Sequence, residues 1–294
     1  MDNMFNRGTG LLVIEAVNSN PNGDPDRESE PRQRPSGHGE ISPVSFKRKV
    51  RDLLEDHESV FFNNLPATYL QNADRYWILE SRGRDRNAIK EEMAENIGEF
   101  NEADYLGSKF VHKYWDARVF GNTFLEEDAN KGYIKTGVVQ FGVGISVSPV
   151  EIVRHTNTNK AGVQEGKSAG MAPLAFRIVE HGVYCMPFFV NPNLARKTGC
   201  SVEDIELLKL LIPYAYDLNR SAIRPDVRIR HAWYIEHKSP LGSCPEHLLL
   251  EALTPTRVNN ADKPSKSWAD YVDKTELPPA LKERVKTVCD LVLA

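Results

Sequence analysis

Residues 11–54, LLVIEAVNSNPNGDPDRESEPRQRPSGHGEISPVSFKRKVRDLL, decide the fold of this 294-residue chain. Residues 10–17 are a nearly continuous run of aliphatic and β-branched side chains, which predicts a buried strand. From Asn18 to Glu40 the chain carries almost no apolar side chain. A connection that long without its own secondary structure usually serves a function or has no fixed structure. The strand, the polar loop and the basic segment that follows indicate an anion-binding surface beside a sheet.

The basic segment after the loop is predicted to be a helix. Ser42 suits the N-cap position and Pro43 the first helical position. One apolar stripe follows at the spacing of a helix, formed by Phe46, Val50, Leu53 and Leu54. The rest of the circumference holds the cations Lys47, Arg48, Lys49 and Arg51, with no acid among them. Such a cluster is either the wet side of an amphipathic helix or, because like charges one turn apart repel, a site for a phosphate backbone.

Polar turn residues alternate just beyond the predicted strand: Asn18, Asn20, Asn22 and Gly23. The sequence Asn-Pro-Asn-Gly is a strong turn signal, and a turn alone is one interpretation. The other is that the amides and open backbone N–H groups contact phosphate or ribose oxygens. The glycine would let the backbone approach such a ligand closely. Both interpretations stay open on spacing alone.

Acidic residues also alternate in the loop: Asp24, Asp26, Glu28 and Glu30. Their oxygens would suit Mg²⁺ or Ca²⁺, but the loop lacks the glycine turn and the frame of an EF-hand. Arginines interleave with them, which favours a solvated loop of mixed charge. We expect no metal and no other cofactor.

Catalytic motifs are weak in this chain. His38 lies between two glycines and could act as a general base beside an RNA 2′-hydroxyl, although a lone histidine in a glycine turn is more often inert. No nucleophile elbow, phosphate loop or zinc-protease motif is present. We expect a protein that is not an enzyme.

Composition sets further bounds. With 40% hydrophobic residues the chain can bury one large core or two modest ones. Its net charge of -4 argues mildly against nucleic acid, but acids gather over 91–104, away from the cations of 47–51, and binding depends on local potential. The four cysteines lack zinc spacing and indicate a reducing compartment. No leader or membrane span is apparent, so we expect a cytoplasmic protein without a membrane partner.

The rest of the chain predicts alternating strands and helices. Predicted strands cover 115–120, 137–147, 231–237 and 247–253, and predicted helices cover 88–100, 201–216 and 279–293. A polar stretch, 155–173, lies between apolar segments and predicts a projecting hairpin. The order of these elements is compatible with a ferredoxin-like α+β core that carries insertions.

A second basic set follows the helix that starts near Ser201: Arg220, Arg224, Arg228 and Arg230. Arginine suits phosphate because its guanidinium donates two parallel hydrogen bonds. Trp233 and Tyr234 come next and could stack on bases, but packing in the core is the commoner role for at least one.

Eight segments carry a family resemblance and keep their order: AVNSNPNGDPD (16–26), SGHGE (36–40), FKRKVRDLL (46–54), DARVFG (116–121), VVQFGVGISVSPV (138–150), EHGVYCMPFFVNPNLARKTGCSVED (180–204), DLNRSAIRPD (217–226) and EHKSPLGSCPEHLLL (236–250). Together they resemble the backbone subunit of type I CRISPR Cascade complexes, of the RAMP superfamily, with subtypes I-C and I-B nearest. They cover about half of the chain.

The resemblance implies an α+β fold over 1–294, with an RRM-like (ferredoxin-like) palm, a helical finger insertion at 58–112 and a β-hairpin thumb at 150–178. Such subunits polymerise head to tail along a guide crRNA, displace about every sixth base and leave the rest to pair with target DNA. The implied partners are the crRNA, target DNA through the guide, copies of the chain itself, a large subunit and a subunit that binds the crRNA 5′ handle. The role is non-catalytic.

The site residues expected from the motifs and the resemblance fall into two groups. The first is expected to bind RNA: Asn18, Asn20, Asn22, Gly23, Arg34, His38, Ser45, Lys47, Arg48, Lys49, Arg51, Arg118, Phe120, Gly121, Arg220 and Arg224. The second is expected on the thumb: Arg154, His155, Lys167 and Met171. Two alternatives stay open: a type III-like subunit in which Asp24 or Asp26 and Mg²⁺ cut target RNA, and a stand-alone RRM-like RNA-binding module.

Overall fold

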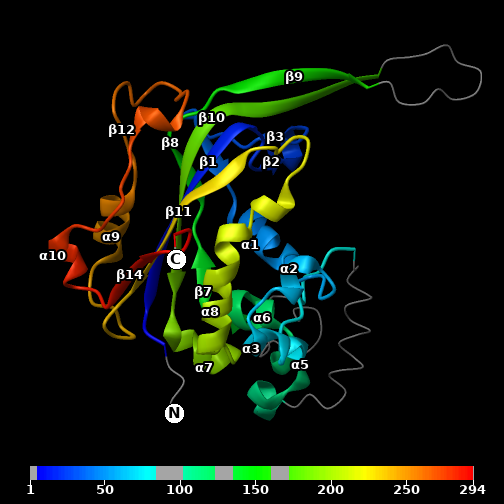
Figure 1. Ribbon diagram of the computed structural model, residues 1–294, viewed down its shortest axis with the longest axis vertical. Helices are drawn as coiled ribbons and strands as arrows, with labels where there is room; N and C mark the ends of the chain where they lie inside the picture. Colours follow the sequence, from blue (N-terminus) through cyan, green and yellow to red (C-terminus); the bar gives the residue numbers. More distant parts are fainter. Residues whose placement is uncertain (1–4, 84–101, 123–134, 160–171, 294) are drawn as a thin grey trace, which may run out of the picture.

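A computed structural model describes residues 5–83, 102–122, 135–159 and 172–293 (Figure 1). Its main sheet is built from β1 (Gly8–Ser19), β4 (His38–Ile41), β7 (Val139–Phe141), β8 (Gly144–Pro149), β9 (Ile152–Asn159), β10 (Ala172–Val190), β11 (Val227–Glu236) and β14 (Thr287–Asp290). The strand order is β14-β11-β1-β10-β8-β4, with β7 and β9 also paired to β10, and every pairing is antiparallel. The expected α+β fold is confirmed as a mixed α/β chain around a large antiparallel sheet.

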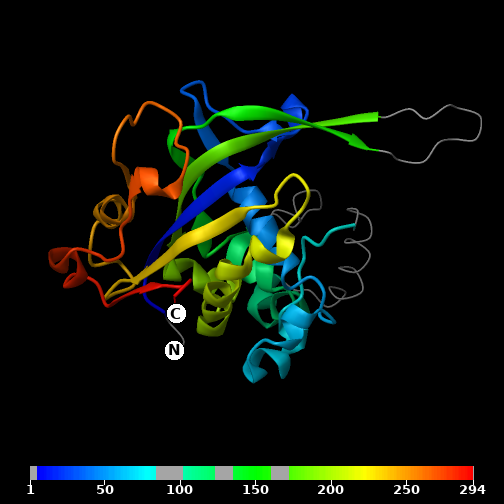
Figure 2. The ribbon, with the colours of Figure 1, turned by 45° about the horizontal axis from the view of Figure 1, so that its top comes forward.

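The helices lie on both sides of this sheet: α1 (Pro43–Asp52), α2 (Val60–Asn63), α3 (Ala67–Leu70), α5 (Lys109–Lys113), α6 (Trp115–Phe120), α7 (Ala195–Thr198), α8 (Val202–Leu211), α9 (Glu246–Leu253) and α10 (Pro279–Lys282). Three short ribbons complete the described structure: β2 (Gly23–Asp24) with β3 (Glu30–Pro31), β5 (Gly121–Asn122) with β6 (Lys135–Thr136), and β12 (Thr256–Arg257) with β13 (Tyr271–Val272). Figures 1 and 2 show α1, α6 and α8 on one side of the sheet, and α9, α10 and the β12–β13 ribbon on the other.

Strand β1 lies in the middle of the sheet and is covered on both faces. Leu12 and Ile14 belong to the core beneath α1 and α8, whereas Leu11 and Val13 belong to the core beneath α9. A strand that is buried on both faces has a continuous apolar sequence, which is the pattern of residues 10–17. The predicted strand is therefore confirmed, with both of its faces used for packing.

The β9–β10 hairpin extends beyond the sheet (Figures 1 and 2). Residues 179–190 of β10 pair with β1, whereas residues 172–178 pair with β9 alone. The predicted hairpin is confirmed at its base, and residues 160–171 lie outside the described residues. The predicted helix at 88–100 also lies outside them.

Helix starts were well predicted. In α1, Ser42 Oγ accepts a hydrogen bond from Ser45 N at 3.2 Å, with Pro43 in the first turn. In α8, Ser201 and Asp204 form a reciprocal capping box. Local capping chemistry is readable from sequence because it involves residues only three positions apart.

Three predicted elements are wrong. Residues 115–120 form helix α6 rather than a strand; all six are buried, so no polar face marks the helical period. Residues 247–253 belong to helix α9, whose leucine, alanine and glutamate residues are good helix formers. The predicted C-terminal helix ends at Lys282, after which β14 pairs with β11.

No helix in the described part of the chain is long and apolar enough to span a membrane.

Candidate nucleic-acid interface

The asparagine turn and the start of helix α1 are joined directly. The backbone N–H of Ser42, the N-cap, donates to Asn22 Oδ1 at 2.7 Å. The Asn22 amide also donates to Gly23 O at 3.0 Å. Asn22 therefore fixes the position of the loop relative to the first turn of α1.

The three asparagines have different roles. Asn20 is 2% exposed, and its Nδ2 donates to Ser29 O at 2.7 Å, across the loop. Asn18 is exposed and has φ 44°, a left-handed conformation that asparagine tolerates better than most residues. The amides of Asn20 and Asn22 thus hold the turn itself, and the Asn18 side chain is the one that faces solvent.

Two of the four acidic loop residues, Asp24 and Glu30, have partners within the fold. Asp24 Oδ1 accepts from Asp26 N at 3.2 Å, and Arg32 lies 3.8 Å from the same oxygen. Glu30 forms an ion pair with Arg177 on β10. Across the ranges that the structure describes, no three histidine, cysteine or acidic side chains gather as a metal site would require. The loop acids thus stabilise the turn and dock it on the hairpin strand.

The second half of the loop forms β4 and a turn before it. Arg34 Nε donates to Glu40 Oε2 at 2.9 Å. His38 Nδ1 lies 3.1 Å from Ser36 Oγ, in an exposed contact within the same turn. These contacts hold the turn in which both predicted site residues lie.

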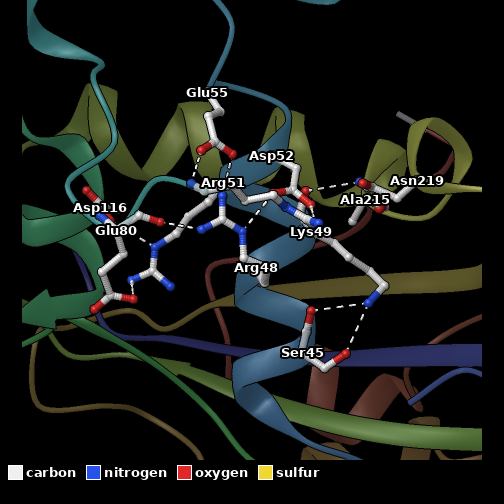
Figure 3. A network of polar contacts seen from close by, with 11 residues as sticks. Ser45, Arg48, Lys49, Arg51, Asp52, Glu55, Glu80, Asp116, Ala215 and Asn219 are labelled. Atoms are coloured by element: carbon white, nitrogen blue, oxygen red, sulfur yellow. Dashed lines mark hydrogen bonds and ion pairs between the residues drawn. The ribbon is translucent and has the colours of Figure 1, made fainter. Parts of the chain in front are cut away.

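The two arginines of α1 are paired with carboxylates (Figure 3). Arg48 Nε donates to Asp52 Oδ1 at 2.7 Å, and its guanidinium also contacts Glu55. Arg51 is 5% exposed, and its Nε donates to Asp116 Oδ2 at 2.8 Å. The sequence holds no acid among the four cations, but carboxylates from later positions in the chain neutralise both arginines, so phosphate is not needed for these two.

Neither lysine of α1 contacts a carboxylate among the residues that the structure describes. Lys47 Nζ lies 5.2 Å from the centroid of the Phe120 ring. Burial and the nearby Arg51 lower the pKa of Lys47, although Glu80 opposes this. Lys49 Nζ lies 5.3 Å from the centroid of the Tyr216 ring.

Lys49 is the more deeply buried of the two, at 5% exposure. Its Nζ donates to Ser45 Oγ at 3.0 Å and to Ser45 O at 3.3 Å (Figure 3). Burial, with a contribution from the neighbouring Arg224, lowers the pKa of Lys49 to about 7, and Asp52 opposes the shift only partly. Ser45, a predicted site residue, therefore serves as the anchor of a lysine that lacks a carboxylate.

Arg118 occupies a different place from the one expected. It is 1% exposed, and its two ion-pairing nitrogens donate to Asp204 at 2.9 and 2.8 Å. The remaining N–H groups donate to backbone carbonyls, those of Arg75, Val111 and His112. All five guanidinium donors are thus used inside the protein. The structure gives Arg118 the task of joining α6 to α8, and none of its donors is directed to a ligand.

Phe120 is the last residue of helix α6 and Gly121 its C-cap, and the Phe120 ring lies beside Lys47. Phe120 is 7% exposed, and Gly121 adopts φ 79°, which favours glycine. A Cβ on Gly137 would lie 2.1 Å from the Phe120 carbonyl carbon, so the two backbones approach closely there. This close approach fixes the position of Phe120, whose ring face lies 5.2 Å from Lys47 Nζ and 5.2 Å from Arg51 Cζ.

The second basic set is divided. Arg224 Nε donates to Asn20 O at 3.1 Å, which brings it to the asparagine turn. Arg220 is exposed and lies 3.2 Å from Asp217. Arg230 Nε donates to Glu15 Oε2 at 2.8 Å, and Arg228 pairs with Asp226.

The aromatic residues that could have stacked on bases lie in the core. Trp233 and Tyr234 are 5% and 6% exposed, and they belong to the cores on opposite faces of the sheet. Base stacking on this strand is excluded by that burial.

The structure thus gathers one set of predicted residues and leaves others apart. The asparagine turn, the start of α1, Lys49 and Arg224 meet in one region. Tyr216 belongs to this region and was not predicted, because no local pattern separates it from an ordinary core aromatic. Arg154 and His155 lie on β9, with His155 stacked on Phe176 at a centroid distance of 6.1 Å. Two predicted thumb residues, Lys167 and Met171, lie outside the described residues.

Comparisons with known proteins agree with one another. A family model described as CRISPR-associated protein Cas7 matches residues 6–276. A curated relative from Haloferax volcanii, also described as CRISPR-associated protein Cas7, is 26% identical over 227 residues, which are 70% of this chain. The matched region spans 63% of that relative's length, which is less than two thirds.

Two solved structures are similar at 14% identity. One is described as a CRISPR RNA-guided surveillance complex, pre-nicking, with TM-score 0.43 and 77% of each chain covered. The other is described as a CRISPR RNA-guided surveillance complex, with TM-score 0.38. The match covers 88% of this chain and 77% of the chain in that structure.

Proposed function

This chain belongs to the CRISPR-associated protein Cas7 family, and from that premise we propose that it is the crRNA-binding backbone subunit of a type I Cascade complex. The observation that carries the proposal is the meeting of the asparagine turn, Arg224 and Lys49, a buried lysine that contacts no carboxylate in the described structure. Lys47, on another side of α1 beside Phe120, adds a second lysine without a carboxylate contact among the described residues. Phosphate oxygens would complete the coordination that these groups lack.

The sheet topology supports an RRM-like palm. The elements β1, α1, β8, β10, α8 and β11 follow one another along the chain, and their strands lie in the order β11-β1-β10-β8. That is the β-α-β-β-α-β arrangement of a ferredoxin-like fold. The finger at 58–112 and the thumb at 150–178 are then insertions within one domain of residues 1–294. The projecting β9–β10 hairpin supports the second of these assignments.

The way in which this palm would grip RNA follows from its covered sheet. Helices and loops bury both faces, and the aromatics of β11 lie in the two cores. RNA is therefore expected along the loop and helix edge, held through phosphates and 2′-hydroxyls rather than by bases stacked on strands. Contacts of that kind are independent of sequence, and they leave the bases free to pair with a target.

The assembly that we propose is an open helical filament. Head-to-tail contacts that do not close into a ring build such a filament. Each thumb would displace about every sixth base, and the exposed guide would pair with target DNA. The remaining partners would be a large subunit and a subunit that binds the crRNA 5′ handle.

The role is that of a non-catalytic scaffold. Asp24 already caps a turn within the loop, and Asp26 supplies the N–H that it accepts. A type III-like reaction predicts Mg²⁺-dependent cleavage of complementary RNA by the assembled complex, lost in Asp24→Ala. That result would contradict the scaffold.

RNA binding is tested by removing the two lysine charges while keeping the length of both side chains close to native. We expect Lys47→Gln with Lys49→Met to weaken binding of unrelated RNA sequences equally, and to reduce the slope of log affinity against log salt by about 1–2. Lys263→Gln, an exposed lysine in the β12–β13 loop on the other side of the sheet, is the matched control. An affinity and slope equal to the control's in the double variant would contradict this site.

A further inference from the structure

Lys49 Nζ is buried, and no carboxylate among the described residues contacts it. Two oxygen acceptors contact it, both from Ser45: the hydroxyl oxygen at 3.0 Å and the carbonyl oxygen at 3.3 Å. The face of the Tyr216 ring lies beside it, with 5.3 Å between Nζ and the ring centroid. These neutral groups do not balance the charge of an ammonium ion, and a buried charge without a counter-ion is unfavourable.

The charges that face Lys49 favour the neutral form as well. Arg224 approaches from the loop before β11 and repels a second cation. Asp52, on α1, attracts it, but that carboxylate is already held by Arg48 and Arg82, and Arg82 also repels Lys49. Tyr216 offers its ring face, and burial raises the pKa of its hydroxyl far above neutrality, so it supplies no anion.

Two further buried groups near this lysine also lack partners. Asn20 Oδ1 and the Tyr216 hydroxyl make no hydrogen bond among the residues that the structure describes. Asn20 is tied to Arg224 through its carbonyl, and Tyr216 lies under the lysine. Buried polar groups without hydrogen-bond partners in one region indicate that a bound ligand supplies those partners.

We propose that Lys49 is a neutral amine in much of the free protein and becomes an ammonium ion when an RNA phosphate arrives, so that guide binding takes up a proton. This inference rests on the proposed function and adds a regulation to the same site. The phosphate supplies the counter-charge, and the proton comes from the buffer. With the pKa of free Lys49 at about 7, uptake is small at pH 6 and nearly complete at pH 8.

The sign of the pH dependence follows from this linkage. The bound state holds more protons than the free state between pH 7 and the higher pKa of the bound lysine. RNA affinity therefore falls as pH rises in that window, by up to about tenfold per pH unit. Below pH 7 the lysine is already charged, and affinity depends little on this group.

Isothermal titration of the full chain with a 5′-hydroxyl oligoribonucleotide measures this directly. Titrations at pH 8 in HEPES and in Tris, whose ionisation enthalpies differ and which hold no phosphate, give the protons taken up per bound subunit. We expect roughly 0.9 proton at pH 8 and roughly 0.1 at pH 6 from Lys49. An RNA without a terminal phosphate is used because a phosphate monoester titrates near pH 6.

Variants assign the proton. Lys49→Arg stays charged at all these pH values, so it should bind without the Lys49 uptake and with an affinity independent of pH between 7 and 8.5. Lys49→Met, which keeps the buried length without charge, should also show no uptake from this position and should bind more weakly at pH 6. Lys263→Arg, on the exposed β12–β13 loop, should behave like the native protein.

Two results would overturn the inference alone: tight RNA binding with no uptake at pH 8, or uptake that persists in Lys49→Arg and disappears in Lys47→Arg. Absence of RNA binding by the native protein at both pH values would overturn the proposed function, and this inference with it.

Discussion

Arg51 on helix α1 donates from Nε to Asp116 Oδ2 at 2.8 Å, and both side chains are buried. The second oxygen of Asp116 accepts the backbone N–H of Leu79 at 2.7 Å. One carboxylate thus joins α1, α6 and the segment before residue 80 (Figure 3). This pair fixes one side of α1 against α6, while Lys49 lies on another side, beside Tyr216.

Removing the Asp116 charge should destabilise the protein severely. Asp116→Asn leaves the buried guanidinium of Arg51 with the half-exposed Glu80 carboxylate, 3.0 Å away, as its remaining ion-pair partner among the described residues, which costs about 3 kcal/mol of unfolding free energy. Arg82→Ala removes an ion pair whose arginine is 65% exposed and should cost less than about 1 kcal/mol. Urea unfolding followed by circular dichroism compares the two. An Asp116→Asn protein as stable as Arg82→Ala would show that the pair is unimportant.

Arg118 should behave as a structural residue. Arg118→Lys loses the forked contact with Asp204 and several donors to buried carbonyls, so we expect a loss of at least about 2 kcal/mol in unfolding free energy. The fraction of the variant that stays folded should bind RNA with native affinity. Thermal melting and RNA binding at low temperature separate the two effects. If the Arg118→Lys variant had native stability but bound RNA more weakly, Arg118 would instead be an RNA-binding residue.

His231 should make the C-terminal strand sensitive to pH. Its Nδ1 contacts Asp290 Oδ2 on β14 at 2.6 Å, and its Nε2 contacts Asp273 Oδ1 at 2.9 Å. The hydrogen bond with Asp290, supported by Asp273 and opposed by burial, raises the pKa of His231 above its usual 6.5. A raised pKa means that the stabilisation is fully present below pH 6.5 and is lost as pH rises through the folded-state value.

We therefore expect the native protein to have a higher melting temperature than the His231→Gln variant at pH 6. The difference between the two melting temperatures should become smaller as pH rises toward 9. His112→Gln is the control, since His112 is 54% exposed and pairs with an exposed aspartate. A gap between native and His231→Gln that stays constant from pH 6 to 9 would rule out this coupling.

Features set by neighbours in the chain could be predicted from the sequence. The central strand was recognisable from its apolar run, and the start of α1 from Ser42 and Pro43. The asparagine turn followed from Asn-Pro-Asn-Gly. The turn and the helix start depend on contacts between residues only a few positions apart. The strand is buried on both faces, so its sequence is continuously apolar and needs no alternating pattern to be recognised.

Features set by distant residues could not be predicted. Asp116 meets Arg51 across 65 positions, so the sequence showed an uncompensated cluster where the structure pairs both arginines. Helix α6 is buried on every side and carries no amphipathic signal. The difference between Lys49 and its neighbours depends on Tyr216 and Arg224, which only the fold brings to α1.

In the proposed function, many copies of this chain coat one RNA without regard to its sequence. Hydroxyl-radical footprinting of a guide-length RNA, with the full chain titrated onto it, tests this most directly. We predict protection that grows in steps of about six nucleotides as protein is added, and the same steps on an unrelated sequence. A single footprint of fixed length that does not extend with excess protein would contradict the account.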